Sequence, residues 1–465
     1  MLVSKLFGGG ADYEALPSVE GMRLITSFTG SRGVRYPAPD VARGFMLLLI
    51  ALANVPTWVH LSRSSIPAAG TIDTAWLWVR TLFIDQRSFP LFAMLFGFGL
   101  MTMINRRIAS GTRAYLQSLP GVDAGCEPTP QEEAWAREQA TVDARRLVRR
   151  RGLWMILFGA AHATLFSGDI IGLYGLIAVV FAGWIARKHW KRAAVLSAVI
   201  IVASIVITFV LGSLMGSPGA TPAAAANQEA AGSTITLLSY ISHGIVVWAA
   251  STGTGLVTMA VPTVFLGVRL ADTDLIAHPE RHCRLLAVIG VGGLGLGALG
   301  GIGTAVAATG GPQVIWTAPL HEMTGLVSAC GWLALLALYA GGPREGGDLT
   351  GLRRLASNVG RRSMTAYLTQ SFLFAAVFLA LPALTGIELH LGEARVAGIA
   401  VAVWLVTVVL CATLERGGHA GPFETLLRTA VARSERKRPH PTPPSPTAGA
   451  IAAPADTHPE TVPAG

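Results

Sequence analysis

The sequence predicts an all-α, polytopic bundle of about ten transmembrane helices, and three observations support this fold class. Of the 465 residues, 52% are hydrophobic and only 14% are charged, which is too little charge to cover a soluble protein of this size. Apolar runs long enough to cross about 30 Å of hydrocarbon recur along the chain. Basic residues are concentrated in alternate loops, as the positive-inside rule requires of cytoplasmic loops.

Ten crossings with the basic loops inside place both termini in the cytoplasm, and we expect a multi-pass protein of the plasma membrane. The expected spans are residues 43–61, 88–104, 153–186 (a hairpin of two spans), 193–215, 237–268, 285–308, 316–339, 363–384 and 394–414. The stretch 237–268 is too long for one straight crossing. Its interruption, Ser251-Thr-Gly-Thr-Gly255 followed by Pro262, predicts a kinked or broken helix.

We divide the chain into three parts. Residues 1–40 are expected to form a mobile cytoplasmic arm, residues 41–430 the transmembrane domain, and residues 431–465 a disordered cytoplasmic tail. Within the domain, residues 105–151 are expected to be a long, charged, partly helical cytoplasmic loop. Membrane lipids are the expected partners, and the charge pattern gives no reason to expect nucleic acid. The four cysteines lack metal-ligand spacing, so no metal site is expected.

The hairpin 153–186 is the first place to look for function, because it carries an ionisable pair at membrane depth. Basic residues precede and follow it, so its closed end should face outward. Roughly 15 residues separate Arg151 from Asp169, about 22 Å of helix, which is less than the hydrocarbon thickness. We therefore expect the turn below the outer surface, either inside protein or beside a water-filled recess. His162 would lie near the midplane and Asp169 toward the outer side.

Each residue of this pair has a structural and a catalytic interpretation. Asp169 is either an N-cap of the following helix or a carboxylate that positions a base. His162 either forms an interhelical hydrogen bond or acts as a general base. Asn54 and Glu322 reach similar depth on two other helices, and we expect them to join the pair as catalytic residues in one outward-facing recess. Their structural alternatives are a packing hydrogen bond for Asn54 and interface exposure for Glu322 and the adjacent His321.

A second group of polar residues gathers at the inner helix ends. Arg43, Arg361 and Arg362 are candidates for contacts with the phosphates of an acyl donor, with anchoring of the topology as the alternative. Tyr367 and Gln370 are three positions apart, hence on one helix face, and are assigned to the same cofactor-binding group.

Five segments of the membrane part carry recognisable motifs. They are Arg43-Gly44 with Asn54; residues 88–100 (SFPLFAMLFGFGL); GAAH (159–162) with GDI (168–170) and YG (174–175); residues 360–371 (GRRSMTAYLTQS); and GPFE (421–424) with Arg428. Together they resemble the YeiB-like family of bacterial integral membrane proteins, which carries domain of unknown function 418. The last segment is also expected to form a short amphipathic helix, in which Glu424 and Arg428 are a solvated i,i+4 pair.

The chain departs from the family pattern at Ala366, where the family usually has Asn, and at Thr425, where it has Trp. The resemblance implies a distant similarity to membrane acyltransferases, which move an acyl group onto an acceptor across the bilayer. In the acyltransferase-3 relatives an Arg is followed eleven positions later by a catalytic His. That spacing here gives Arg43 and Asn54, so this His is absent. His162 is a candidate substitute from its position, not from the resemblance.

Two functions of different classes remain open. In the first, an acyl donor such as an acyl-coenzyme A thioester approaches from the cytoplasmic side. His162, held by Asp169, then takes a proton from an acceptor hydroxyl or amine at the outer face. In the second, the protein is a transporter or lipid-handling carrier, whose broken sixth helix and glycine-rich seventh helix allow bundles to rock.

Overall fold

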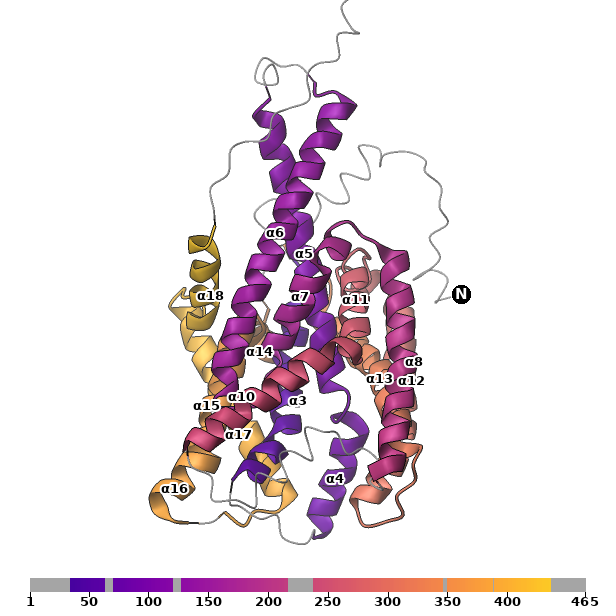
Figure 1. The fold of residues 1–465 in the computed structure, drawn as a ribbon, viewed down its shortest axis with the longest axis vertical. Helices are drawn as coiled ribbons and strands as arrows, with labels where there is room; N and C mark the ends of the chain where they lie inside the picture. Colours follow the sequence, from indigo (N-terminus) through magenta and orange to yellow (C-terminus); the bar gives the residue numbers. More distant parts are fainter. Residues whose placement is uncertain are drawn as a thin grey trace, which may run out of the picture.

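The computed structural model describes residues 34–62, 70–119, 127–215, 237–345, 349–387 and 389–435. In this part the fold is all-α, as predicted, with helices that run mainly along one axis and pack side by side (Figure 1). A two-residue antiparallel pair, β1 (Val34–Arg35) with β2 (Arg344–Glu345), is the sole sheet within these limits. Most of the predicted arm, the loop 216–232 and the tail beyond residue 435 lie outside the described residues.

Most expected spans are helices with nearly the predicted bounds, because an uninterrupted apolar run satisfies its backbone hydrogen bonds internally. These helices are α3 (Ala38–Leu61), α5 (Ser88–Gln117), α8 (Trp190–Met215), α12 (Cys283–Ala308), α13 (Thr317–Ala340), α15 (Ser363–Ala375) and α17 (Glu393–Arg416). After α15 the helix continues through a π-helical turn, η5 (Ala376–Ala380), into α16 (Leu381–Thr385).

The predicted break in the sixth span is confirmed. The segment consists of α10 (Leu237–Thr254), the 3-10 turn η3 (Gly255–Val257) and α11 (Ala260–Leu270), and its two parts are bent by 59°. In Figure 1, α10 crosses the bundle diagonally while α11 runs along it.

The number of helices long and apolar enough to cross a membrane is seven in the described residues, or eight if the bent pair is one span. The two helices of the predicted hairpin are α6 (Pro130–Ala163) and α7 (Ile171–Ala186). They fall outside this count because the first part of α6 is highly charged and α7 has only 16 residues. Ten spans would require both to cross, so the number ten stays a prediction.

The described residues of the charged segment 105–151 are mainly helical, a larger share than the partly helical loop that was expected. α5 continues far beyond its apolar part, and α6 begins at Pro130, where the Thr129 hydroxyl accepts the Glu132 amide hydrogen and the Glu132 carboxylate accepts the Thr129 amide hydrogen. This capping box satisfies free amide groups at the helix start. The two helices project together beyond the rest of the bundle (Figure 1).

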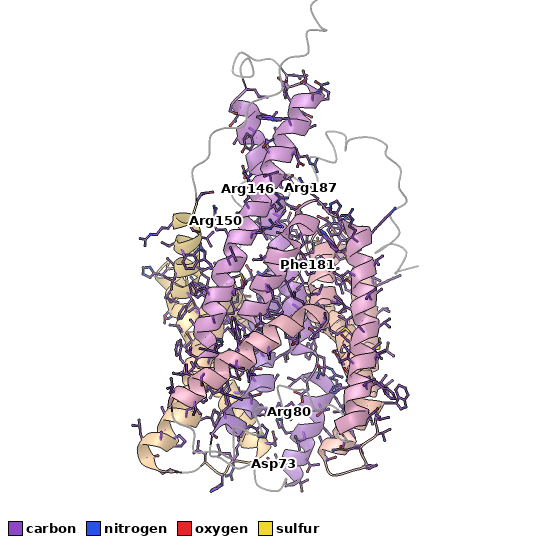
Figure 2. The ribbon with its side chains drawn as sticks, in the orientation of Figure 1. Asp73, Arg80, Arg146, Arg150, Phe181 and Arg187 are labelled. Carbon is purple, nitrogen blue, oxygen red and sulfur yellow. The ribbon has the colours of Figure 1, made fainter. Side chains whose placement is uncertain are left out.

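We call the end of the bundle from which α5 and α6 project the basic end. Arg146, Arg150 and Arg187 lie toward it, whereas Asp73 and Arg80 lie at the opposite end (Figure 2). Four further helical segments complete the structure: α4 (Thr71–Phe83), the 3-10 turn η4 (Pro279–Arg281), α14 (Gly351–Arg361) and α18 (Pro422–Arg433). The short helix expected after the last span is therefore confirmed as α18, whereas α4 and α14 lie between expected spans.

Candidate functional site

The tip of the α6–α7 hairpin brings His162 and Asp169 together. His162 lies in the last turn of α6, and Asp169 lies two residues before α7 begins. The His162 Nδ1 atom is 2.8 Å from the Asp169 Oδ1 atom. The exposed fraction is 2% for the His162 side chain and 0% for that of Asp169, so the two hydrogen-bonded side chains are fully buried.

The second carboxylate oxygen of Asp169 accepts two more hydrogen bonds. The Gly172 amide nitrogen is 2.8 Å from Oδ2, and the Trp248 Nε1 atom on α10 is 3.2 Å from it. Both interpretations of Asp169 are therefore compatible with one geometry, because one oxygen satisfies an amide in the first turn of α7 while the other holds the imidazole.

The hydrogen bond to Asp169 assigns the tautomer of His162. An ionised carboxylate can only accept, so the proton of a neutral imidazole is on Nδ1 and the Nε2 lone pair is available. Nε2 is buried and has no hydrogen-bond partner in the described part of the chain. An unpartnered buried lone pair is costly in an apolar interior, which makes this atom a candidate for contact with a ligand.

Two glycines allow the hairpin to close this tightly. A Cβ atom on Gly159 would lie 2.5 Å from both Asp169 Oδ2 and the Gly172 amide nitrogen. A Cβ atom on Gly172 would lie 2.6 Å from the Trp248 ring. Any side chain at either position would therefore separate α6, α7 or α10 around the carboxylate.

Aromatic rings from other parts of the bundle pack against the His162–Asp169 pair. The Tyr367 ring on α15 lies edge-on to the His162 ring with 5.3 Å between centroids, and the Phe166 ring lies 6.1 Å away. Phe166 in turn stacks on Trp58 of α3. The expected recess open to the outer face is therefore wrong for this conformation, because the imidazole is sealed by its aromatic neighbours.

Helix α10 covers the hairpin tip. Besides the Trp248 bond, the Tyr240 hydroxyl donates to the Leu165 carbonyl at 2.7 Å, and a Cβ on Gly244 would lie 2.7 Å from the Ala163 carbonyl oxygen. Sequence reasoning missed Trp248 as a site residue. The available signal was a tryptophan a few residues before the predicted helix break.

The other two predicted catalytic residues are not part of this cluster. Asn54 is half-buried on α3 and forms no hydrogen bond with His162 or Asp169. Glu322 accepts a hydrogen bond from the Thr208 hydroxyl of α8 at 3.0 Å. His321, expected at an exposed interface, is buried against Arg87. The structure thus brings together only two of the four predicted catalytic residues.

The predicted cofactor-binding residues also separate. Arg361 and Arg362 form ion pairs with the same carboxylate, that of Glu415, at 2.5 Å and 2.8 Å, which holds both guanidinium groups against α17. Tyr367 is adjacent to His162, as described above. Gln370 is buried, with its Nε2 atom 3.4 Å from the Leu47 carbonyl oxygen of α3.

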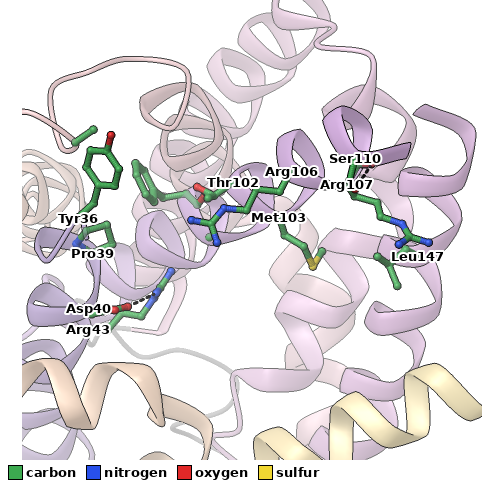
Figure 3. Close-up of a pocket in the computed structure, with 13 residues that line it drawn as sticks. Tyr36, Pro39, Asp40, Arg43, Thr102, Met103, Arg106, Arg107, Ser110 and Leu147 are labelled. Carbon is green, nitrogen blue, oxygen red and sulfur yellow. Dashed lines mark hydrogen bonds and ion pairs between the residues drawn. The ribbon is translucent and has the colours of Figure 1, made fainter. Parts of the chain in front are cut away.

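Arg43, by contrast, lines a cavity of about 530 Å³ at the basic end, between the start of α3 and the middle of α5 (Figure 3). Its guanidinium is 3.3 Å from Asp40 and donates to the Leu95 carbonyl at 3.2 Å. Among the residues predicted to bind a cofactor, Arg43 is the one that lines this cavity.

Glu424 on α18 has a different role from the expected pair with Arg428. Its Oε1 atom accepts from the Met364 and Thr365 amide nitrogens at 2.8 Å and 3.0 Å, and its other oxygen accepts from the Thr365 hydroxyl. The carboxylate therefore caps the N-terminus of α15, where free amide groups and the helix dipole favour a negative charge.

Comparison with known proteins finds similarity to one family model and to one bacterial protein. Residues 270–434 match the model of the family described as "Protein of unknown function (DUF418)". The chain is also similar to the uncharacterized protein YxaH of Bacillus subtilis (strain 168), with 26% identity over 377 residues, which is 75% of this chain and 80% of that protein. No solved structure matches. The motifs at 360–371 and 421–428 lie inside the family match, whereas the His162–Asp169 hairpin lies before it.

Proposed function

We propose that this protein is a YeiB-like enzyme of the bacterial cytoplasmic membrane that transfers an acyl group to an acceptor, with His162 as the general base. The observation that carries the proposal is the His162–Asp169 pair, in which Nδ1 is held at 2.8 Å and Nε2 is buried without a partner. A carboxylate that fixes the tautomer and orientation of an imidazole prepares its other nitrogen to accept a proton.

The proposed reaction balances without a metal or a redox step. The Nε2 atom of His162 takes a proton from an acceptor hydroxyl or amine, and the acceptor atom attacks the carbonyl of an acyl thioester. The carbon–sulfur bond then breaks, and the leaving thiolate takes the proton from His162. The products are an ester or amide and a free thiol. Asp169 keeps its three hydrogen bonds and stabilises the transient imidazolium.

Access of the acceptor requires a conformational change, because the pair is sealed in the present structure. α10 is the element whose displacement would open it, since α10 covers the hairpin through Tyr240, Gly244 and Trp248 and ends at a bend. A helix that is interrupted near its contact with a site can move without unfolding the bundle.

The test uses the purified full-length protein in lipid nanodiscs with palmitoyl-coenzyme A and a mixed panel of hydroxyl and amine acceptors. Release of free coenzyme A thiol is expected for the wild type. His162→Ala should reduce it at least about 100-fold, the usual contribution of a general base. His60→Ala is the matched control, because His60 is exposed at the end of α3. Thiol release by a folded His162→Ala variant at the wild-type rate would remove this residue from the mechanism.

The contact between Trp248 and Asp169 favours transport as the second candidate function. A broken helix bonded to a buried ionisable pair would couple the protonation of that pair to movement of the helix. Transport predicts a pH-dependent flux of substrate into proteoliposomes that is lost in Asp169→Asn, without release of thiol. Thiol release without flux would leave acyl transfer as the function.

A further inference from the structure

The cavity at the basic end has the lining of a binding site rather than of a packing defect. Its volume of about 530 Å³ lies in the range of ligand pockets, roughly 300–1,000 Å³. Arg43 of α3 and Arg106 and Arg107 of α5 contribute positive charge, against the single carboxylate of Asp40. The cavity is therefore positively charged and suited to an anion.

Arg43 is held in place before any ligand binds. Its two terminal nitrogens contact Asp40 and the Leu95 carbonyl, and the contact with Asp40 is drawn in Figure 3. Gly99 leaves the necessary room, since a Cβ at that position would lie 2.5 Å from the Arg43 Nη2 atom. A preorganised guanidinium loses little conformational entropy when an anion binds.

Arg106 and Arg107 are the uncompensated charges. Both side chains are exposed, and neither forms an ion pair with any described residue. Figure 3 shows Arg106 extended toward Thr102 and Arg107 at the other end of the cavity beside Leu147. The positive-inside rule explains why arginines occur at this end of the bundle, but it does not require them to line a hollow.

We infer that this cavity binds a phosphate ester that carries an apolar group. Arg43 and Arg106 provide fork-shaped donors that match phosphate oxygens. Thr102 also lines the cavity, and its hydroxyl donates to the Phe98 carbonyl oxygen at 2.8 Å. Phe98, Met103 and Leu147 provide the apolar wall. A phospholipid headgroup and an acyl nucleotide thioester share this chemistry. The assignment of the cavity to the acyl donor rests on the proposed function, whereas phosphate binding is measured without any reaction.

The experiment measures binding by the full-length protein with two probes. Palmitoyl-coenzyme A binding is measured in phosphatidylcholine nanodiscs, and retention of phosphatidylglycerol is measured by native mass spectrometry. Arg106→Gln should weaken binding of at least one probe about tenfold, as expected for one lost charged hydrogen bond. Gly99→Ala should weaken the same probe, because it displaces the Arg43 guanidinium.

Arg149→Gln is the matched control, because it removes one exposed arginine from the same end of the molecule without touching the cavity. His162→Ala should bind both probes like the wild type, so a failure of the acyl-transfer proposal leaves this inference testable. If Arg106→Gln loses binding of palmitoyl-coenzyme A alone, the ligand of the cavity is a coenzyme A thioester. If it loses binding of phosphatidylglycerol alone, the ligand is a phospholipid. Equal binding of both probes by Arg106→Gln, Arg149→Gln and the wild type would overturn the inference.

Discussion

His162 and His321 are both buried in the helix bundle beside a charged side chain, but their polar neighbours differ. The Nε2 atom of His321 contacts the Arg87 guanidinium and lies 3.1 Å from the Thr81 carbonyl oxygen. Arg87 itself is fully buried and donates to the carbonyl oxygens of Thr81, Asp85 and Gly297. At His162 the Nδ1 atom is bonded to Asp169 and Nε2 is left open.

The difference distinguishes a structural cluster from a candidate reactive one. Arg87 links the segment between α4 and α5 to α12 and α13, and its charge is spread over backbone carbonyls from both regions. The role of the Arg87 cluster is therefore to stabilise the packing of these helices. The His162–Asp169 pair is equally buried, but the His162 Nε2 atom has no hydrogen-bond partner among the described residues. The burial of the two histidines does not distinguish the structural one, His321, from the candidate base, His162. Their hydrogen-bond partners do.

The largest expected effect in this comparison is on the structural side. Arg87→Leu should destabilise the protein by about 3 kcal/mol or more, because it removes from a buried site the guanidinium that donates to the carbonyl oxygens of Thr81, Asp85 and Gly297. Thermal unfolding in detergent measures the change. Arg113→Gln, an exposed arginine on the projecting part of α5, is the control and should unfold like the wild type. Equal unfolding temperatures for both variants would show that Arg87 does not hold these helices together.

The next effect concerns the packing of the hairpin. Gly159→Ala should cost about 1–3 kcal/mol, because the added methyl group overlaps Asp169 and the backbone of α7. It should also raise the rate at which diethyl pyrocarbonate modifies His162, as mapped by mass spectrometry. Gly292→Ala is the control: a Cβ there meets nothing within 4 Å, so stability should rise slightly or stay unchanged. An unchanged modification rate in Gly159→Ala would argue against closure of the pair by this contact.

The smallest effect isolates the covering helix. Trp248→Phe removes the 3.2 Å hydrogen bond to Asp169 while it keeps most of the ring, so it should cost about 1 kcal/mol. Modification of His162 should become faster as α10 opens more often. Trp154→Phe is the control, because it removes an exposed hydrogen bond to the Ser434 hydroxyl. Its unfolding free energy should change by about 0.5 kcal/mol or less, since an exposed hydrogen bond contributes little. The same modification rate in both variants would show that α10 does not control access.

Local features of this fold were readable from the sequence, and distant pairings were not. The apolar runs predicted the long helices, and Ser251-Thr-Gly-Thr-Gly255 with Pro262 predicted the break. His162 and Asp169 were predicted to lie together because only a turn separates them. The capping signal at Thr129 and Glu132 was also present, although the prediction for this segment was only a partly helical loop.

The contacts of the site that could not be predicted from the sequence are those between helices distant along the chain. Trp248 reaches Asp169 across 79 positions, and Arg87 reaches His321 across 234. Equal membrane depth was the basis for grouping Glu322 with His162, but depth says nothing about position around the bundle. Glu322 faces α8 instead. A single sequence carries no information on the order of helices around the bundle, and this is why the predicted group of four was reduced to two.

The cap formed by Glu424 links a peripheral helix, α18, to a helix that reaches the buried histidine, α15. One carboxylate on α18 grips the first turn of α15, and two positions beyond Thr365 the same helix carries the Tyr367 ring that packs on the imidazole. α18 exposes most of its residues, so it lies at the periphery of the bundle. A displacement of α18 would therefore move the first turn of α15 and, with it, the Tyr367 ring beside His162.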